Sequence, residues 1–368
     1  MAIRAILGFD ELALRTGEMY GAATKYAFAG LPMSFNFGTA AGAGVSFLKE
    51  AGWVKTITNP ATANNTSGKR NFISAPLTAL GLVTSAASVI TIGIRWLIPQ
   101  DVTVSSMWPQ PISLTADLST GGAGANVTAG AVFPFGSIPN WKPGIENYLE
   151  AQFDVTAGVI RRRVDGLPIA DLSMVTLVKN LLTSNTAFFA GGVGYTPTSG
   201  ATVAYDFWFK DMYVIEKTDD GSADTFLGPQ RIVPINVTTL DQASWLPTPS
   251  GDPVAALNTA ITDEASLLTP VVMTDPNNVT ANLGLTMSST AGQINGIVLN
   301  ATGKKAGGSP GVLTSQVITG TDQSSQVVNN LLSVITPSFK LYQGEKSPSG
   351  ARWTRASIQA AKLKLIAG

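Results

Sequence analysis

Apolar residues in this chain recur mainly at every second position, which is the period of a β-strand with one buried face. The clearest example is residues 89–98, where one face carries Ile90, Ile92, Ile94, Trp96 and Ile98. Alternation returns over residues 148–155 and again over 159–164, which end at the pair Asp165-Gly166. Because Asp-Gly between two such runs is a strong hairpin signal, a third strand is predicted from Leu167 onward.

Further strands are predicted on both sides of the chain's midpoint. Around residue 207, Tyr205, Phe207 and Phe209 share one face and Trp208 lies on the other. Later strands are predicted over residues 231–238, 293–302, 311–319 and 362–366. Helical periodicity is scarce, and its best candidates are residues 23–28, 255–259 and 354–361. The pattern therefore predicts an all-β protein of antiparallel sheets.

Composition narrows the possible functions. The chain has 368 residues, more than one sandwich usually needs, so two domains are expected. Its 24 basic residues balance its 24 acidic ones, which argues against nucleic acid as a partner. The absence of Cys and His excludes disulfides, Cys/His zinc sites and Ser-His-Asp triads. Chemistry by paired carboxylates or oxygen-ligand cation binding stays open.

One uncharged stretch is long enough to cross a bilayer. Residues 73–94 carry no charge, but they contain Pro76 and alternate in their second half, so strands are predicted and membrane insertion is not. The N-terminal residues do not form a secretory signal, because Asp10 and Glu11 follow the short apolar run too soon. We therefore read them as mature sequence, made in the cytoplasm.

Several motifs together carry a family resemblance. The stretch YLEAQFDV…GVIRRRVDGLPI resembles the central hairpin of concanavalin-A-like, laminin-G-type jelly rolls. It is followed by VAYDFWFKDMYVIEK, TFLGPQRI, an isolated Trp245 and PSGARWT. This order is similar to that of tailed-bacteriophage virion proteins with a jelly-roll domain and a C-terminal β-domain, and it covers roughly residues 70–368. The chain departs from the pattern at Pro229-Gln230, where an acidic residue is commoner.

The resemblance implies a fold class and a domain plan. The fold is an antiparallel jelly-roll or concanavalin-A-like sandwich followed by a second, smaller β-sandwich domain. The expected divisions are an N-terminal assembly arm with the first strands (1–70), the jelly roll (71–216), a linker (217–230) and the C-terminal domain (231–368). The arm, which contains AFAGLPMSFNFGTAAGAG, is expected to order on contact with partner subunits.

The resemblance also implies a function without catalytic residues. The expected protein is a non-enzymatic structural component of a virion, in a tail or a tail appendage. It is expected to form a homo-oligomer, with a trimer favoured, and to contact other virion proteins. The alternatives are a host-surface carbohydrate (receptor) binding protein, a capsid decoration protein, and a polysaccharide depolymerase that uses two carboxylates.

Candidate site residues follow from these alternatives. Trp108, Trp141 and Trp208 are candidates for carbohydrate binding, since an aromatic face stacks on a pyranose; the other interpretation is packing against a subunit or loop. Arg161 and Arg163 share a strand face and are candidates for an anionic partner or a subunit interface.

Acidic residues are the remaining candidates. One set lies along the predicted hairpin and the strand near residue 207: Asp154, Asp165, Asp206, Asp211 and Glu216. Opposed carboxylates support glycoside hydrolysis, but solvated strand faces explain them more simply. The loop at 219–224 offers oxygen ligands in an order unlike a known calcium loop, so a turn is predicted, with no metal and no cofactor.

Overall fold

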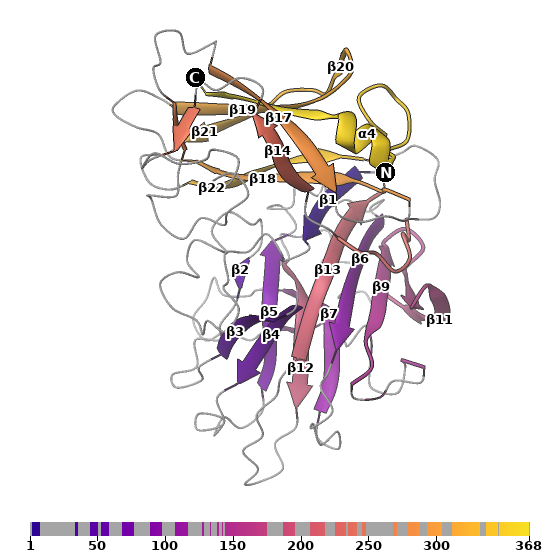
Figure 1. Cartoon of the computed structure of the whole chain (residues 1–368). Coiled ribbons are helices and arrows are strands. Elements are labelled where there is room, and N and C mark those ends of the chain that lie inside the picture. The colour runs from indigo at the N-terminus through magenta and orange to yellow at the C-terminus, as the bar shows by residue number, and fades with distance from the viewer. Residues whose placement is uncertain are drawn as a thin grey trace. The chain divides into compact units, whose positions relative to one another are not determined.

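The computed structural model of the chain is built almost entirely of β-strands (Figure 1). It describes residues 2–7, 34–35, 45–50, 53–58, 68–76, 89–97, 107–116, 127–128, 133, 138–139, 142, 144–174, 187–195, 207–217, 225–232, 235–240, 245–247, 268–270, 279–287, 293–303, 311–331, 336–344 and 346–367. The chain divides into two compact units. Most of the chain up to Ile232 belongs to the first unit, and all residues from Val233 onward belong to the second.

An eight-stranded antiparallel sheet, which we call the large sheet, organises the first unit. Its order is β11-β10-β9-β6-β13-β4-β3, and β1 also pairs with β13. The strands are β1 (Ala2–Leu7), β3 (Val45–Glu50), β4 (Trp53–Thr58), β6 (Val89–Leu97), β9 (Asn147–Asp154), β10 (Val159–Val164), β11 (Leu167–Ser173) and β13 (Phe207–Glu216). Three of these strands come from the first 70 residues. Within the expected arm (1–70), the segment 27–44 lies outside the described residues except at residues 34–35.

A five-stranded antiparallel sheet accompanies the large sheet in the first unit. Its order is β2-β5-β12-β7-β8. The strands are β2 (Ser34–Phe35), β5 (Gly68–Pro76), β7 (Met107–Ala116), β8 (Val127–Thr128) and β12 (Ala187–Tyr195). The predicted all-β, antiparallel sandwich class is therefore confirmed. The two ends of the uncharged stretch 73–94 lie in strands β5 and β6, and the described residues contain no helix long and apolar enough to span a bilayer.

The predicted core face of the large sheet is confirmed. Its β6 members are Ile90, Ile92, Ile94 and Trp96, each at most 1% exposed. In the neighbouring β9, Phe153, Ala151 and Leu149 pair with the three isoleucines and are also fully buried. Each large aliphatic or aromatic side chain buried in this way contributes roughly 1.5–3 kcal/mol relative to exposure.

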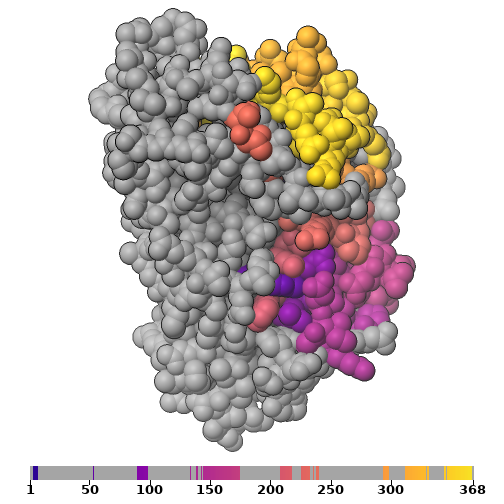
Figure 2. All heavy atoms as spheres, in the orientation of Figure 1, coloured from indigo at the N-terminus to yellow at the C-terminus, as the bar shows by residue number. Residues whose placement is uncertain are grey.

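The hairpin between β10 and β11 is confirmed as predicted. Its two turn residues, Asp165 and Gly166, have φ angles of 51° and 82°. Positive φ at both central positions is the geometry that favours Asp-Gly, because glycine has no Cβ and aspartate tolerates the left-handed region. The β10-β11 edge lies at the surface, in magenta in Figure 2, and most side chains of β11 are exposed.

The second unit is a smaller β-domain. Its main antiparallel sheet has the order β14-β17-β23-β19-β20, with β21 also paired to β19, and two further pairs are β15-β16 and β18-β22. The strands are β14 (Ile235–Leu240), β15 (Trp245–Pro247), β16 (Leu268–Pro270), β17 (Val279–Met287), β18 (Ile297–Gly303), β19 (Gly311–Thr319), β20 (Asp322–Gln323), β21 (Val327–Leu331), β22 (Thr336–Gln343) and β23 (Lys362–Ala367). The predicted strand over 311–319 coincides with β19, and those at 231–238 and 293–302 are displaced by up to four residues.

One short helix, α4 (Arg355–Ala360), precedes the last strand, as the periodicity over 354–361 predicts. Thr354 caps it: the Ser357 backbone N–H donates to Thr354 Oγ1 at 3.0 Å, and the Thr354 N–H donates to Ser357 Oγ at 2.8 Å. This reciprocal pair satisfies donors that a helix N-terminus leaves unpaired. Ile358, 1% exposed, anchors the helix in the core of the unit. The other two predicted helices lie outside the described residues.

Candidate functional site

The face of the large sheet opposite its core, which we call the outer face, is covered by the chain itself. Residues 225–232, which we call the strap, lie across it and follow β13 in the sequence. Gln152 Nε2 donates to Thr225 Oγ1 at 2.8 Å, and the Gly228 N–H donates to Glu150 Oε1 at 2.9 Å. As a result Thr91 and Gln152, on the face that the sequence pattern leaves to solvent, are at most 1% exposed.

Gly93 in β6 makes room for an aromatic ring on the outer face. A Cβ at Gly93 would lie 2.3 Å from Cε1 of Tyr213, so the ring lies directly over the β6 backbone. From β13 the Tyr213 hydroxyl thus reaches across β6 and donates to Oε1 of Glu150 in β9. It also accepts a hydrogen bond from the Leu227 N–H of the strap at 3.2 Å.

Tyr148 crosses β6 in the opposite direction. From β9 its hydroxyl donates to the backbone carbonyl of Asp211 in β13 at 3.0 Å. The rings of Tyr148 and Tyr213 stack with centroids 6.4 Å apart and planes 19° from parallel. Burial raises the pKa of both tyrosines well above the ordinary value, and the nearby Glu150 adds to the shift. The two hydroxyls therefore act as neutral donors that tie β9 to β13 over β6.

Glu150 is a buried carboxyl on the outer face, and within the described residues one of its two oxygens lacks a hydrogen-bond partner. Its side chain is fully buried, and Oε1 accepts from Tyr213 and from the Gly228 N–H. Within the described residues, Oε2 has no hydrogen-bond partner. Burial raises the pKa of Glu150, and the hydrogen bonds from Tyr213 and Gly228, with the charge of Arg163, offset part of that rise.

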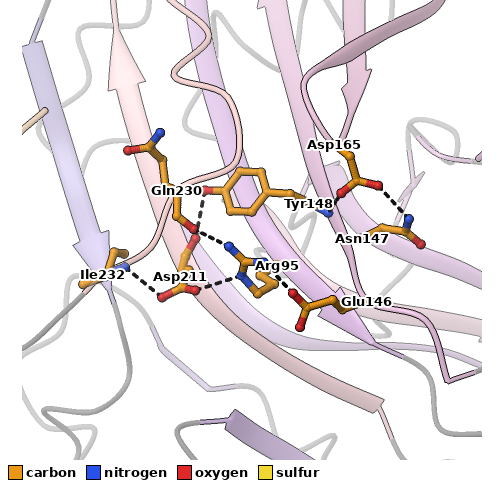
Figure 3. Close-up of polar contacts among 8 residues, drawn as sticks. All are labelled: Arg95, Glu146, Asn147, Tyr148, Asp165, Asp211, Gln230 and Ile232. Carbon is orange, nitrogen blue, oxygen red and sulfur yellow. Dashed lines mark hydrogen bonds and ion pairs between the residues drawn. The ribbon is translucent and has the colours of Figure 1, made fainter. Parts of the chain in front are cut away.

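Arg95 is the centre of the polar contacts at the other end of the strap (Figure 3). Its Nε donates to Asp211 Oδ2 at 2.9 Å and its Nη1 to Glu146 Oε1 at 2.7 Å. Nη2 donates to the strap carbonyl of Gln230, also at 2.7 Å. The guanidinium carbon lies 5.4 Å from the ring centroid of Tyr148, within cation–π range. Arg95 thus joins β6, β9, β13 and the strap.

Asp211 lies in a bulge of β13. Its φ of 50° coincides with the register shift between Lys210 and Tyr213, and this extra residue directs the carboxyl to Arg95. Asp211 Oδ1 accepts the Ile232 N–H of the strap at 3.0 Å. Burial raises the pKa of Asp211, while the Ile232 N–H and Arg95 act in the opposite direction.

The hairpin turn supports the same group of residues. Asp165 Oδ1 accepts the Tyr148 N–H at 2.7 Å, and Oδ2 accepts Asn147 Nδ2 at 2.9 Å (Figure 3). A Cβ on Gly166 would lie 3.3 Å from Cδ of Pro229, so the turn also approaches the strap closely. The Asp-Gly pair therefore positions Tyr148 and leaves room for the strap.

The expectation of solvated carboxylates is wrong for two of the five candidates. Asp211 and Glu216 are 3% and 5% exposed, and Glu216 accepts Arg4 Nε at 2.9 Å. Asp154 is half-buried in an ion pair with Arg161, and Asp165 is exposed at its turn. Asp206 and the loop 219–224 lie outside the described residues. The buried carboxyls are stabilised by hydrogen bonds to partners that are distant in the sequence. Alternation along a single strand cannot predict such partners.

Trp208 lies on the outer face beyond the strap, in a small aromatic cluster. Its ring centroid is 6.3 Å from that of Trp53, with the planes tilted by 59°. Lys210 Nζ lies 4.1 Å from the Trp53 ring centroid, and Lys210 pairs in register with Arg95. Trp53 is buried, whereas Trp208 and Lys210 are half-buried. We call Trp53, Trp208 and Lys210 the tryptophan cluster.

Of the other two candidate tryptophans, the backbone of one is described. Trp108 lies in β7 of the five-stranded sheet, where it pairs in register with Gly194. Trp141 lies outside the described residues. Carbohydrate binding by either residue stays a prediction.

The arginine triplet divides between the two faces of β10 as its alternation predicts. Arg161 Nη1 donates to Gln152 at 2.9 Å and to Asp154 at 2.8 Å. The Arg163 guanidinium carbon lies 4.2 Å from the ring centroid of Phe226 in the strap. Both candidates for an interface therefore have partners within the chain. Arg162, on the opposite face, is buried and donates to the Ala170 carbonyl at 2.9 Å.

Sequence reasoning missed the four residues that form the centre of the outer face: Arg95, Tyr148, Glu150 and Tyr213. One signal was present, because a glycine inside a strong strand pattern often marks a close approach, as Gly93 does here. The described residues contain no group of three or more acidic side chains that could hold a metal ion.

Comparisons with known proteins give a fold-level likeness. No protein-family model matches the sequence, and no curated protein matches it. A GH131 β-glucanase catalytic domain from Podospora anserina is 13% identical, with a TM-score of 0.34 over 56% of this chain and 96% of its own. An alginate lyase solved with an alginate trisaccharide is 9% identical, with a TM-score of 0.35 over 58% and 98%. An alginate lyase from Pseudomonas aeruginosa is 11% identical, with a TM-score of 0.32 over 46% and 86%.

These findings correct the expected function. The similar structures are carbohydrate-active enzymes, which contradicts the expectations of a non-enzymatic protein and of a structural component of a virion tail, appendage or capsid. At these TM-scores the likeness assigns no activity to this chain. The resemblance to tailed-bacteriophage proteins, the trimer, the virion location and partners, and the absence of nucleic acid and membrane as partners are not tested and stay predictions.

Proposed function

We propose that the first unit binds a carbohydrate on the outer face of the large sheet, at the tryptophan cluster. The observation that carries the proposal is the half-buried indole of Trp208, held against Trp53 on the same face as Lys210 and Arg95. An indole face packs well against the C–H groups of a sugar ring, and nearby polar groups fix the ring by bonding to its hydroxyls.

The cluster is built to hold its shape. Trp53 and Trp208 come from the paired strands β4 and β13, and Lys210 covers the Trp53 ring. Lys210 is paired with Arg95, which is itself fixed by Asp211, Glu146 and the strap. Because these side chains are positioned before any ligand arrives, binding costs little conformational entropy.

Binding of the full chain to a panel of neutral and acidic polysaccharides, measured by affinity electrophoresis, tests the proposal. Wild-type protein is expected to be retarded by at least one polysaccharide, and Trp208→Ala is expected to lose that retardation. Leu167→Ala is the matched control, since Leu167 is a 70% exposed apolar residue on the edge strand β11 of the same sheet. It is expected to bind as wild type does.

Three outcomes would contradict the proposal. They are no retardation by any polysaccharide, equal retardation of wild type and Trp208→Ala, or equal loss in Leu167→Ala. If Trp208→Ala instead changes the mass measured by light scattering, the indole packs against a second copy of the chain. Reducing-end release from the bound polysaccharide, followed in the same samples, shows whether binding leads to cleavage.

A further inference from the structure

The strap is attached to the outer face mainly through its own backbone. Two of its amides donate to carboxylates: Gly228 to Glu150 at 2.9 Å and Ile232 to Asp211 at 3.0 Å. A third, that of Leu227, donates to the Tyr213 hydroxyl at 3.2 Å. Two of these three acceptors are carboxyl groups, so the charge of the groups that hold the strap depends on protonation.

The two carboxylates differ in how their charge is balanced. Asp211 is paired with Arg95 at 2.9 Å. Glu150 has no cation in hydrogen-bond contact within the described residues, and its Oε2 accepts no hydrogen bond there. The charge of Arg163 acts on it from β10, and the Arg163 guanidinium lies over the strap residue Phe226. An ionised Glu150 beneath the strap is thus a buried charge with few donors, which is an unfavourable state.

We propose that the strap is a latch that closes over the neutral form of Glu150 and opens as Glu150 ionises. Lifting the strap lets water reach Oε2, which stabilises the carboxylate far more than the neutral acid. The closed strap is therefore favoured at acidic pH, and the population of the open strap increases as pH rises.

Among the described residues, no titratable or charged group around Glu150 reverses this direction. From β13 it faces Tyr213, and from its own strand Tyr148, both neutral because burial raises their pKa. From β10 it senses Arg163, and at this point β6 presents Gly93, which has no side chain. Arg231 of the strap is exposed. Burial under the strap raises the pKa of Glu150, so the pH window begins at the ordinary carboxyl value of about 4 and extends upward.

Opening the latch would uncover more of the same face. Tyr148 and Tyr213 lie beneath the strap, and Arg95 connects them to the tryptophan cluster. If carbohydrate binds at Trp208, as the proposed function states, the lifted strap offers it two further aromatic rings. Ligand binding would then strengthen as the latch opens.

Hydrogen exchange of the full chain, measured by mass spectrometry from pH 4 to pH 8 and corrected for intrinsic rates, tests the latch without any ligand. Peptides covering the strap are expected to lose protection by at least about tenfold across the series, while peptides from β6 and β9 keep theirs. Glu150→Gln, which stays neutral, is expected to keep the strap protected at every pH. Asp154→Asn is the matched control on the same face of β9, with no hydrogen bond to the strap, and is expected to behave as wild type.

The latch is ruled out if corrected strap protection in wild type is independent of pH, or if the strap and β6 lose protection together. It is also ruled out if Glu150→Gln retains the wild-type pH response. Should Glu150→Gln fail to fold, the wild-type series alone decides, because the strap and strand peptides are compared within one sample. These outcomes are independent of whether any polysaccharide binds, so failure of the latch and failure of the proposed function are distinguishable.

Discussion

At the scale of single residues, Gly93 controls how the outer face is built. Any side chain there would meet the Tyr213 ring, whose Cε1 lies 2.3 Å from the position of a Cβ. Displacing that ring would also break the contact between the Tyr213 hydroxyl and Glu150. A residue with no side chain thus permits a hydrogen bond between strands that are not neighbours in the sheet.

Gly93→Ala is therefore expected to destabilise the first unit by about 2 kcal/mol, as overpacking of a filled site typically does. The measurement is the urea midpoint of the transition that reports on the first unit. Gly344→Ala, in the second unit, is the control for glycine-to-alanine substitution in open space, because nothing lies within 4 Å of a Cβ there, and the midpoint of the second unit is expected to be unchanged. Equal midpoints for wild type and Gly93→Ala would show that Tyr213 does not need this space.

At the scale of elements, local signals predicted the strands and turns, and distant contacts escaped prediction. The hairpin around Asp165-Gly166, strand β19 and helix α4 were predictable because alternation, turn chemistry and periodicity act within a few residues. Burial of the outer face was not, because it depends on a strap more than 70 residues from Glu150 in the sequence. The alternating polar residues of β9 predicted a face exposed to solvent. In the structure these residues are buried and form hydrogen bonds.

The hairpin turn provides an element-scale prediction. Gly166→Ala is expected to cost about 1–2 kcal/mol, since alanine is strained at a φ of 82° and its Cβ would also press on Pro229. Asp165→Asn, which tolerates positive φ, is the milder control. The measurement is the thermal midpoint of the first unit, together with the hydrogen-exchange protection of the strap. If Gly166→Ala were as stable as wild type, neither strain nor the strap contact would matter at this turn.

Helix α4 provides a second prediction at this scale. Thr354→Ala removes the hydroxyl that accepts the Ser357 N–H, and we expect a loss of about 1 kcal/mol from the second unit. Thr354→Ser keeps the hydroxyl and is expected to retain wild-type stability. Thermal unfolding followed by a probe in the second unit compares the two variants. Equal midpoints for Thr354→Ala and Thr354→Ser would show that the Thr354 hydroxyl does not stabilise the second unit.

At the scale of the whole molecule, buried carboxyls set the pH dependence of stability. Burial raises the pKa of Glu150 above its unfolded value, so the stability it contributes is present at low pH and is lost as pH rises through the folded value. Asp154 acts in the opposite sense: burial raises its pKa, but the Ala157 N–H and Arg161 outweigh that effect and lower it. Its contribution is present at neutral pH and is lost on acidification.

Glu150→Gln is accordingly expected to flatten the decline in stability between about pH 4 and neutral pH, and Asp154→Asn to flatten the loss on acidification. Urea unfolding of the full chain from about pH 2 to neutral pH measures both slopes, because the Asp154 contribution is lost only below the ordinary carboxyl pKa of about 4. Because the chain has two compact units, the transition of the first unit must be followed separately. Parallel pH curves for wild type and Glu150→Gln would show that Glu150 does not contribute to this dependence.

Isothermal titration of the full chain, with an oligosaccharide from the polysaccharide that retards it, measures carbohydrate binding at the tryptophan cluster. We predict that Trp208→Ala weakens the Kd at least about tenfold, roughly 1.4 kcal/mol, while Leu167→Ala keeps the wild-type Kd. A Trp208→Ala protein that is folded and binds with the wild-type Kd would contradict the claim.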